Sequence, residues 1–217
     1  MNAVSIIELI TSLLSGLRVT VTVAFFGIVL AFFLSFAAGF GRLSKYKIVR
    51  VVATVYAEVI RGTSLLVQLF WIYFALPIIG IRLSAMMAGI LALGLNGGAY
   101  GSEVVRSSIN SIPVGQTEAS IALNLTPRRR MWRIILPQAF VQMLPGFGNL
   151  QIEILKGTAL VSLITLGDLT YRANVLNAST MQTTTIFVIL LAMYYLIAWP
   201  LTRGVEALEK KMKVGRY

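Results

Sequence analysis

Residues 96–140, NGGAYGSEVVRSSINSIPVGQTEASIALNLTPRRRMWRIILPQAF, pass from a glycine-rich segment to a polar one and then become apolar again. Pro113 and Pro127 each suit the first turn of a helix, where the missing N–H would have no partner anyway. Thr126 is a good N-cap for the second helix, which makes Asn124-Leu125 the bend between two short helices. The stretch therefore predicts a polar helical hairpin held between two membrane helices, on which a soluble partner can pull.

A helix face without side chains precedes the hairpin. Its glycines are spaced at i, i+3, i+4 and i+7: Gly94, Gly97, Gly98 and Gly101. In a membrane, such a face lets another helix approach backbone to backbone. We expect close helix packing here, and the sequence leaves open whether it lies at a subunit interface or at a pore.

The composition is that of a polytopic membrane protein. The 217 residues are 57% hydrophobic and only 12% charged, whereas soluble proteins carry about 25% charged residues. The chain has no Cys and no His, which excludes disulfides, thiolate chemistry and His-based acid–base work. We expect no catalytic residues, no metal site and no cofactor.

Uncharged runs predict the membrane spans, since about 20 apolar residues cross a bilayer as a helix. We predict an all-α protein with five transmembrane helices, from the runs 19–41, 62–81 (extended back to Tyr56), 83–102, 134–152 and 186–201. The chain 1–217 is then a single transmembrane domain with a core of about 16–205 and a basic tail, 203–217. The N-terminus lacks the pattern of a cleaved signal peptide, so we expect it to be retained.

Basic residues set the expected orientation. Of 19 Lys and Arg, 14 fall in three segments, 42–50, 106–133 and 203–217, which alternate correctly with five spans. The positive-inside rule then places the N-terminus outside and the C-terminus in the cytoplasm. Nucleic-acid binding is excluded as the reason for the net charge of +11, because these residues are spread over three juxtamembrane segments without a DNA-binding motif. Arg128–Arg130 are predicted to anchor at inner-leaflet phosphates.

Three acid–base pairs lie at i, i+3, which places each pair on one helix face. Two of them, near predicted cytoplasmic ends, are expected to neutralise each other and support helix packing. The third follows a Pro145–Asn149 segment that predicts a broken helix, and broken helices line substrate paths in transporters. The packing pairs are Glu58/Arg61 and Glu103/Arg106, and the predicted substrate path is Asn149, Glu153 and Lys156.

Several motifs resemble one transporter family. Gln116-x-Glu118-Ala119 followed by residues 135–139, ILPQA, resembles the EAA loop of ABC-importer permeases of the polar amino acid type, such as those for histidine, glutamine and opines. Residues 56–70, 99–106 and 156–160 are also similar to that family, in the same order. The resemblance implies the type I importer permease fold, in which the loop is a cytoplasmic coupling helix. The residues it assigns to this role are Gly115, Gln116, Glu118, Ala119, Ala122, Leu123 and Asn124.

The resemblance also implies partners and a location. These are an ABC ATPase dimer, a second permease (a homologue or a copy of the chain), an extracytoplasmic binding protein and the bacterial inner membrane. The chain has no Gly-x-x-x-x-Gly-Lys-Ser/Thr motif, so we expect ATP hydrolysis to belong to the partner.

The substrate is expected to be a small polar zwitterion. Residues 61–71, RGTSLLVQLFW, together with Ala122-Leu123-Asn124-Leu125 look closer to permeases for ectoine and hydroxyectoine. The alternative is a polar amino acid such as glutamine, glutamate, histidine or arginine. Asn124 stands where the family usually has Gly, which is tolerable because Asn visits the left-handed region readily.

Two other classes compete with an ABC permease. An ion-driven secondary transporter would favour buried carboxylates and an inverted repeat, but five spans do not divide into two equal halves and no repeat is evident. A membrane enzyme is disfavoured by the lack of His, Cys and any dense catalytic cluster.

Overall fold

The computed structural model describes residues 6–213, and these form helices and connecting turns without any strand. The α-helices are α1 (Ile6–Arg42), α2 (Lys47–Arg61), α3 (Leu65–Phe70), α4 (Ala85–Asn110), α5 (Val114–Ala122), α6 (Pro127–Arg130), α7 (Leu136–Gly157), α8 (Leu169–Thr180) and α9 (Thr183–Lys213). Two π-helical turns, Trp71–Ala75 and Met131–Ile135, and two 3₁₀ segments, Leu76–Ile79 and Thr158–Ile164, extend α3, α6 and α7.

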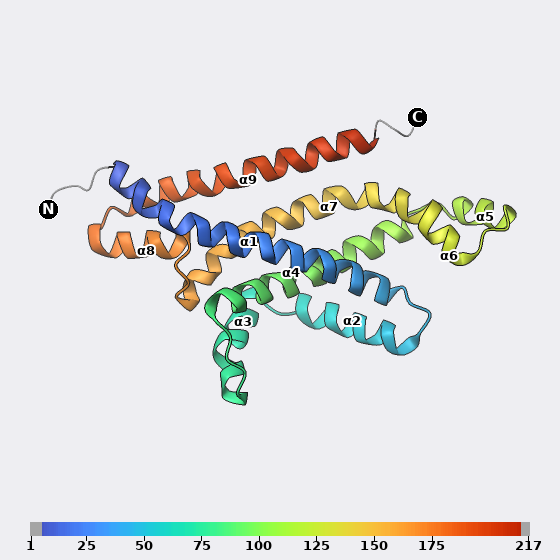
Figure 1. Cartoon of the computed structure of the whole chain (residues 1–217), viewed down its shortest axis with the longest axis horizontal. Helices are drawn as coiled ribbons and strands as arrows, with labels where there is room; N and C mark the ends of the chain where they lie inside the picture. The colour runs from blue at the N-terminus through green and yellow to red at the C-terminus, as the bar shows by residue number, and fades with distance from the viewer. Residues whose placement is uncertain (1–5, 214–217) are drawn as a thin grey trace.

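Four long helices, α1, α4, α7 and α9, follow the long axis of the molecule (Figure 1). The α5–α6 hairpin, the connection from α1 to α2 and the end of α9 all lie at one end of this bundle (Figure 1). The three basic segments of the sequence are therefore gathered at that end. The start of α1 and the helix α8 lie at the opposite end.

Small residues hold α1 and α4 together. Buried Ala31 and Ser35 of α1 face the glycines of α4, and a Cβ added at Gly101 would come within 1.9 Å of Ser35 Oγ. At Gly97 it would come within 2.7 Å of Ile154 in α7. The structure thus places the glycine face inside the chain's own core, between α1 and α7.

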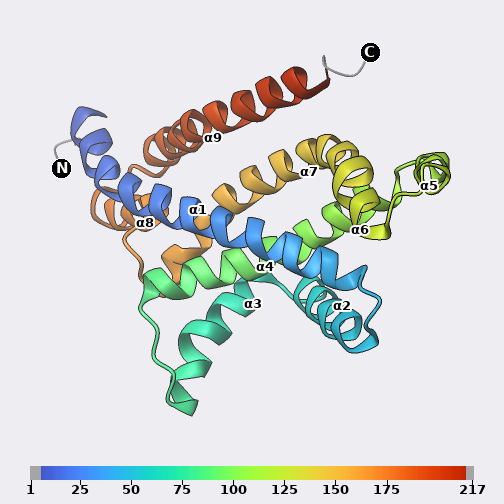
Figure 2. The ribbon, with the colours of Figure 1, turned by 45° about the vertical axis from the view of Figure 1, so that its right-hand side comes forward.

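The second predicted span is not one continuous helix but a bent pair. The segment Lys47–Arg61 and the segment Leu65–Ile79 are bent by 104° relative to each other, and α3 points away from the bundle (Figure 2). The bend falls at Gly62–Ser64, where Ser64 takes an extended conformation with ψ 137°. A helix cannot continue through a residue in that region of the backbone map.

The predicted break at Pro145–Asn149 is wrong, because α7 continues through it from Leu136 to Gly157. The glycines of that segment serve close packing. A Cβ would lie 2.7 Å from Val104 of α4 at Gly146 and 2.5 Å from Val205 of α9 at Gly148. Prolines are tolerated inside membrane helices when neighbouring groups compensate for the lost hydrogen bond.

By length and composition, α1 (Ile6–Arg42) and Thr183–Met212 of α9 are long and apolar enough to cross a membrane among the described residues. Two bent pairs bring the number to four if each is one span: Lys47–Arg61 with Leu65–Ile79, and Pro127–Ile164 with Leu169–Thr180. The predicted third span corresponds to α4, a central helix with many buried small residues. Its middle contains Gly and Asn residues, and it packs between α1 and α7.

Candidate functional site

The hairpin of α5 and α6 has the local structure that its sequence predicts. Thr126 Oγ1 accepts a hydrogen bond from the Arg129 N–H at 3.4 Å, and Pro127 is the first residue of α6. Asn124 lies in the bend with φ 58°, in the left-handed region. Pro113 differs slightly from the prediction, since it is the N-cap of α5 and the helix begins one residue later.

One face of α5 is open and apolar. Val114 and Ile121 lie on this face and are 71% and 58% exposed, with exposed Glu118 one turn after Val114. Leu123, which follows the last residue of α5, is 73% exposed. Nothing lies within 4 Å of a Cβ built on Gly115. Of the residues predicted for coupling, Gly115, Gln116, Glu118, Ala119, Ala122, Leu123 and Asn124 are all exposed. The sequence analysis missed Val114 and Ile121. Val114, Glu118 and Ile121 are spaced i, i+4 and i+7, which would have placed the three residues on one helix face.

The other face of α5 rests on the helix that follows. Gln138 of α7 donates a hydrogen bond to Gln116 Oε1 at 3.2 Å. Ser120 is buried, and its hydroxyl donates to the Thr117 carbonyl at 2.7 Å. A further hydrogen bond joins Ser111, just before α5, to Gln142 of α7. These contacts attach the hairpin to α7.

A polar cavity of about 180 Å³ lies where the bend after α2 meets α4 and α7. Polar side chains from three segments line it: Thr63 and Ser64, Asn96 and Tyr100, and Glu153. The carboxylate of Glu153 has no ion-pair partner among the described residues. The cavity therefore offers one acidic group together with hydroxyl and amide groups.

Gln68 holds the bend that forms one wall of this cavity. Its Nε2 donates to the Ile60 carbonyl at 2.7 Å and to the Thr63 hydroxyl at 2.8 Å. Its Oε1 accepts from Asn96 Nδ2 at 3.1 Å. The side chain thus satisfies a carbonyl at the end of α2 and connects the bend to α4.

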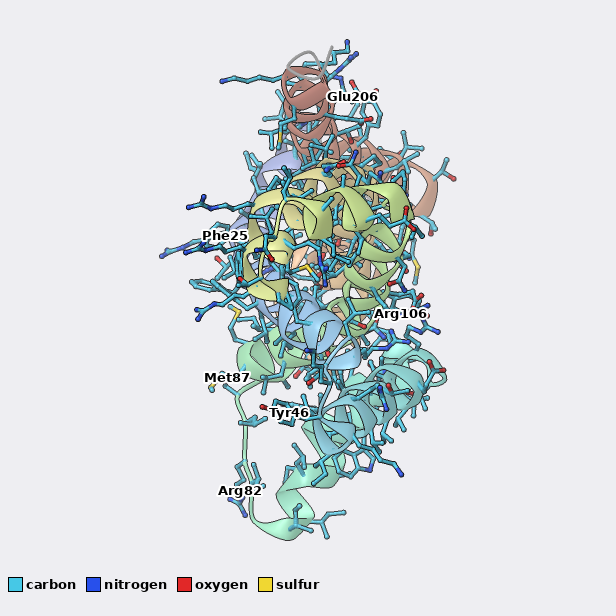
Figure 3. The ribbon with its side chains drawn as sticks, turned by 90° about the vertical axis from the view of Figure 1, so that its right-hand side faces the viewer. Phe25, Tyr46, Arg82, Met87, Arg106 and Glu206 are labelled. Atoms are coloured by element: carbon cyan, nitrogen blue, oxygen red, sulfur yellow. The ribbon has the colours of Figure 1, made fainter. Side chains whose placement is uncertain are left out.

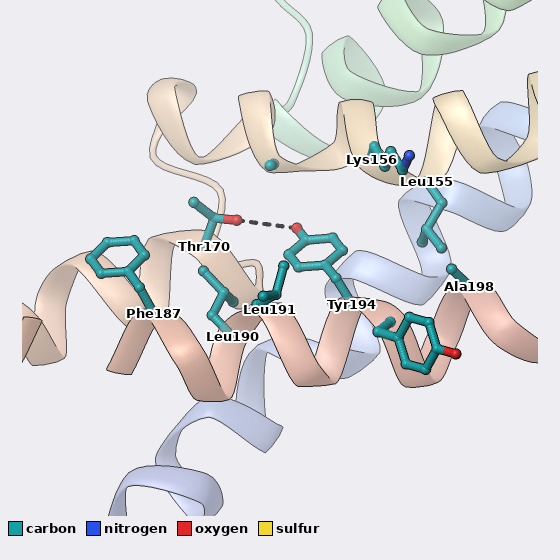
Figure 4. Close-up of a pocket in the computed structure, with 10 residues that line it drawn as sticks. Leu155, Lys156, Thr170, Phe187, Leu190, Leu191, Tyr194 and Ala198 are labelled. Atoms are coloured by element: carbon teal, nitrogen blue, oxygen red, sulfur yellow. Dashed lines mark hydrogen bonds between the residues drawn. The ribbon is translucent and has the colours of Figure 1, made fainter. Parts of the chain in front are cut away.

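The third acid–base pair of the sequence does not form. Lys156 lines a different, mainly apolar cavity of about 510 Å³ between α7 and α9, with Leu155, Tyr194 and Ala198 among its walls (Figure 4). In that cavity the hydroxyls of Thr170 and Tyr194 lie 3.1 Å apart. Asn149 is exposed and lines neither cavity. The i, i+3 spacing gave the wrong pairing because α7 presents Glu153 toward α4 and Lys156 toward α9.

The other two pairs form and join a larger cluster. Glu103 binds Arg106 at 2.5 Å and also Arg42 of α1 at 2.7 Å, and the Arg42 side chain is only 8% exposed. Arg61 lies 3.7 Å from Glu58 and 3.4 Å from Glu103. Glu103 thus connects α1, α2 and α4, and Arg42 is the member that the sequence analysis missed.

An all-α bundle with an exposed hairpin at its basic end and a polar cavity among its helices fits a membrane permease. The comparisons agree with this class. The family described as binding-protein-dependent transport system inner membrane component matches residues 25–214, and the chain belongs to this family. The chain is thus a multi-pass inner-membrane subunit of an ABC importer.

Curated relatives cover most of the chain. One is the probable amino-acid ABC transporter permease protein y4tF of Sinorhizobium fredii (strain NBRC 101917 / NGR234), 45% identical over 91% of this chain and 85% of the relative. Another is the arginine transport system permease protein ArtQ of Bacillus subtilis (strain 168), 34% identical over 93% and 92% of the two chains.

Solved structures share the fold. The crystal structure of an amino acid ABC transporter with histidines aligns with a TM-score of 0.90 at 32% identity, covering 97% of this chain and 99% of the other. An inward-facing MetNI methionine ABC transporter aligns with a TM-score of 0.73 at 21% identity, over 92% and 97% of the two chains, and supports the fold alone. The protein therefore has the type I ABC importer permease fold.

Proposed function

We propose that this chain imports a small polar amino acid, using ATP that a partner ATPase hydrolyses. The observation that carries the proposal is the open apolar face of α5, formed by Val114 and Ile121 on either side of Glu118, with exposed Leu123 just beyond the end of the helix. Exposed apolar patches rimmed by polar residues mark protein–protein interfaces. In this proposal the ATPase dimer binds that face, and the coupling residues are Gly115, Gln116, Glu118, Ala119, Ala122, Leu123 and Asn124.

The basic end of the molecule suggests an orientation, and the remaining partners can then be placed relative to it. The gathering of basic segments around α5 supports a cytoplasmic hairpin and C-terminus, with the N-terminus outside. A second permease, either a homologue or a copy of this chain, would complete the translocation path. An extracytoplasmic binding protein would deliver the substrate at the opposite end, near α8. Residues 214–217 of the predicted basic tail lie outside the described residues.

The polar cavity supports the substrate class. A carboxylate such as Glu153 among hydroxyl and amide groups can pair with the ammonium group of an amino acid or with a cationic side chain. Relatives described for amino acids favour this class over ectoine, which stays a prediction that these relatives do not support. Lys156 opens to a separate cavity, so Glu153 is the proposed substrate-path residue with the strongest structural argument, ahead of Asn149 and Lys156.

Coupling is tested with Glu118→Lys, which places a cation in the middle of the apolar face. The variant is assembled with the ATPase, the second permease and the binding protein in vesicles, and uptake of radiolabelled glutamine, arginine and ectoine is measured. We expect a folded complex that has lost uptake. The matched control is Glu206→Lys, an exposed charge reversal on α9 at the same end, which should keep uptake. Normal uptake in Glu118→Lys would refute the role of α5.

The substrate site is tested with Glu153→Gln. A hydrogen bond to a charged group contributes about 1.5–3 kcal/mol, so KM for the transported amino acid should rise roughly ten- to a hundredfold. Thr202→Ala, on α9 and outside both the cavity and the predicted substrate path, should leave KM nearly unchanged. An unchanged KM in Glu153→Gln would remove the cavity from the proposal while leaving the coupling role of α5 intact.

A further inference from the structure

A basic cavity lies on the side of the hairpin that faces α1. It has a volume of about 250 Å³ and is lined by Arg128, Arg129, Trp132 and Arg133. All four side chains are exposed. None of the ion pairs within the described residues involves these arginines. The cavity thus concentrates three cations with no anion from the described part of the chain.

The π-helical turn Met131–Ile135 shapes this cavity. It widens the helix by one residue between α6 and α7, and Trp132 and Arg133 belong to it. Arg130, which the sequence groups with Arg128 and Arg129, does not line the cavity, and Arg133 takes its place. The grouping therefore comes from the fold and differs from the run of three arginines in the sequence.

Trp132 connects the cavity to an apolar surface on α1. Its ring lies 6.3 Å from the ring of Phe40, near the end of α1. From Phe40 toward the N-terminus, large apolar side chains recur at three- to four-residue spacing on one side of the helix, so they form a stripe along α1. The exposed members are Phe33, Phe32, Val29, Phe26 and Phe25. Figure 3 looks onto the hairpin end and shows Phe25 on the same side of the molecule as α6 and away from Arg106.

A cluster of arginines next to an exposed apolar stripe matches the two parts of a phospholipid. Arginine binds phosphate oxygens through its planar fork of donors, and tryptophan prefers the headgroup level of a membrane. We propose that Arg128, Arg129, Trp132 and Arg133 bind the phosphate headgroup of an anionic inner-leaflet phospholipid, with its acyl chains along the Phe25–Phe40 stripe of α1. This site goes beyond substrate transport, and its assignment to the inner leaflet rests on the proposed cytoplasmic orientation of the hairpin.

The position of α5 argues against the ATPase as the occupant. Helix α5 packs on a different side of this segment, where Gln116 accepts a hydrogen bond from Gln138. Gln138 follows Trp132 by six positions, about 120° away around a helix. In Figure 2, α6 lies between α5 and the end of α1. The contact between Trp132 and Phe40 places the cavity next to α1.

The test uses Trp132 as its own reporter. The full chain with Trp71→Phe and Trp199→Phe keeps Trp132 as its one tryptophan. It is placed in nanodiscs of phosphatidylcholine with increasing fractions of phosphatidylglycerol, brominated near the headgroup end of one lipid at a time. We expect brominated phosphatidylglycerol to quench Trp132 more strongly than brominated phosphatidylcholine at equal mole fraction.

Charge removal identifies the binding residues. Adding Arg128→Gln, Arg129→Gln and Arg133→Gln should lower the preference for phosphatidylglycerol by about tenfold or more, because each basic residue near an anionic membrane surface contributes about 1 kcal/mol. The matched control removes three exposed cations elsewhere at the same end, Lys45→Gln, Lys47→Gln and Arg50→Gln, and should keep the preference. The single change Arg133→Gln should cause a smaller loss of the preference for phosphatidylglycerol, and it is less prone to cause misfolding than the triple change.

Several outcomes would overturn the proposal. Equal quenching by the two lipids, or equal loss in both triple variants, would mean that the cavity does not select an anionic lipid. Displacement of the brominated lipid by millimolar inorganic phosphate would assign the cavity to a free phosphate. An unchanged lipid preference together with lost ATPase co-purification in the Arg128, Arg129 and Arg133 variant would assign the arginines to the ATPase surface.

Discussion

Replacing Gly101 by alanine tests whether the contact between α1 and α4 organises the fold. The new Cβ would lie 1.9 Å from Ser35 Oγ and 2.8 Å from Ser35 Cβ, with Leu150 of α7 at 3.1 Å on another side. Rotating the serine hydroxyl would break its 2.6 Å hydrogen bond to the Ala31 carbonyl. It would also leave the clash with Ser35 Cβ. The two helices must therefore move apart.

Two opposing effects decide the magnitude. Alanine is a better helix former than glycine by about 0.8–1.0 kcal/mol. Against this, overpacking a tight core costs about 1–3 kcal/mol, and the lost serine hydrogen bond costs about 1 kcal/mol more. The balance predicts a net destabilisation of about 1–3 kcal/mol from these terms.

The measurement is unfolding of the purified protein in mild detergent by stepwise addition of a denaturing detergent, followed by circular dichroism. Gly204→Ala is the matched control, because Gly204 lies inside helix α9 and nothing lies within 4 Å of an added Cβ. That change should stabilise by about 0.5–1 kcal/mol. If Gly101→Ala stabilised the protein as much as Gly204→Ala does, the reasoning about α1 and α4 would be refuted.

Two further predictions concern the ion cluster and the hairpin bend. Glu103→Gln should destabilise the fold by roughly 1–3 kcal/mol, less than a fully buried pair because Glu103 is 30% exposed, and the same detergent titration measures it. Little loss of stability would mean that Arg42 does not need the ion pair with Glu103. Asn124→Ala should lower the free energy needed to open the α5 hairpin by about 1 kcal/mol, because alanine at φ 58° is strained. Asn124→Gly should leave this free energy nearly unchanged. Hydrogen exchange of the α5 amides measures this change, and equal exchange in the two variants would contradict it.

The sequence predicts best those features that neighbouring residues decide. The cap at Thr126, the start of α6 at Pro127 and the left-handed bend at Asn124 depend on side chains and backbone within a few residues. The broad helical class follows from composition in the same way. These features are local because a cap or a turn is satisfied by its own segment.

The bend at Gly62–Ser64 could not be predicted, because a distant residue takes part in it. Gln68 bonds back to Ile60 and Thr63 and across to Asn96, and only the fold brings Asn96 to that position. The same reasoning explains α7. Pro145 and its glycines suggest a break when seen alone, but Val104 and Val205 fill the space around Gly146 and Gly148 and keep the helix packed.

Pairing within the candidate site was predictable only in part. Spacing on one helix correctly gave Glu103 with Arg106, but it could not include Arg42, which comes from another helix. The same spacing predicted a pair of Glu153 with Lys156, but the two side chains line different cavities. Which neighbour a charged side chain faces depends on the packing around its helix, and a single sequence does not contain that information in local form.

The continuity of α7 links the two halves of the proposed mechanism. Gln138, which contacts α5, and Glu153, which lines the polar cavity, lie on one unbroken helix. Their separation of 15 residues corresponds to about 22 Å along the axis. A displacement of α5 can therefore reach the cavity through a rigid element, which a broken helix would not provide. The two variants proposed above should separate accordingly: Glu118→Lys loses uptake at unchanged substrate affinity, and Glu153→Gln loses affinity while the ATPase stays bound. Loss of both properties in both variants would show that the two ends are not distinct sites joined by α7.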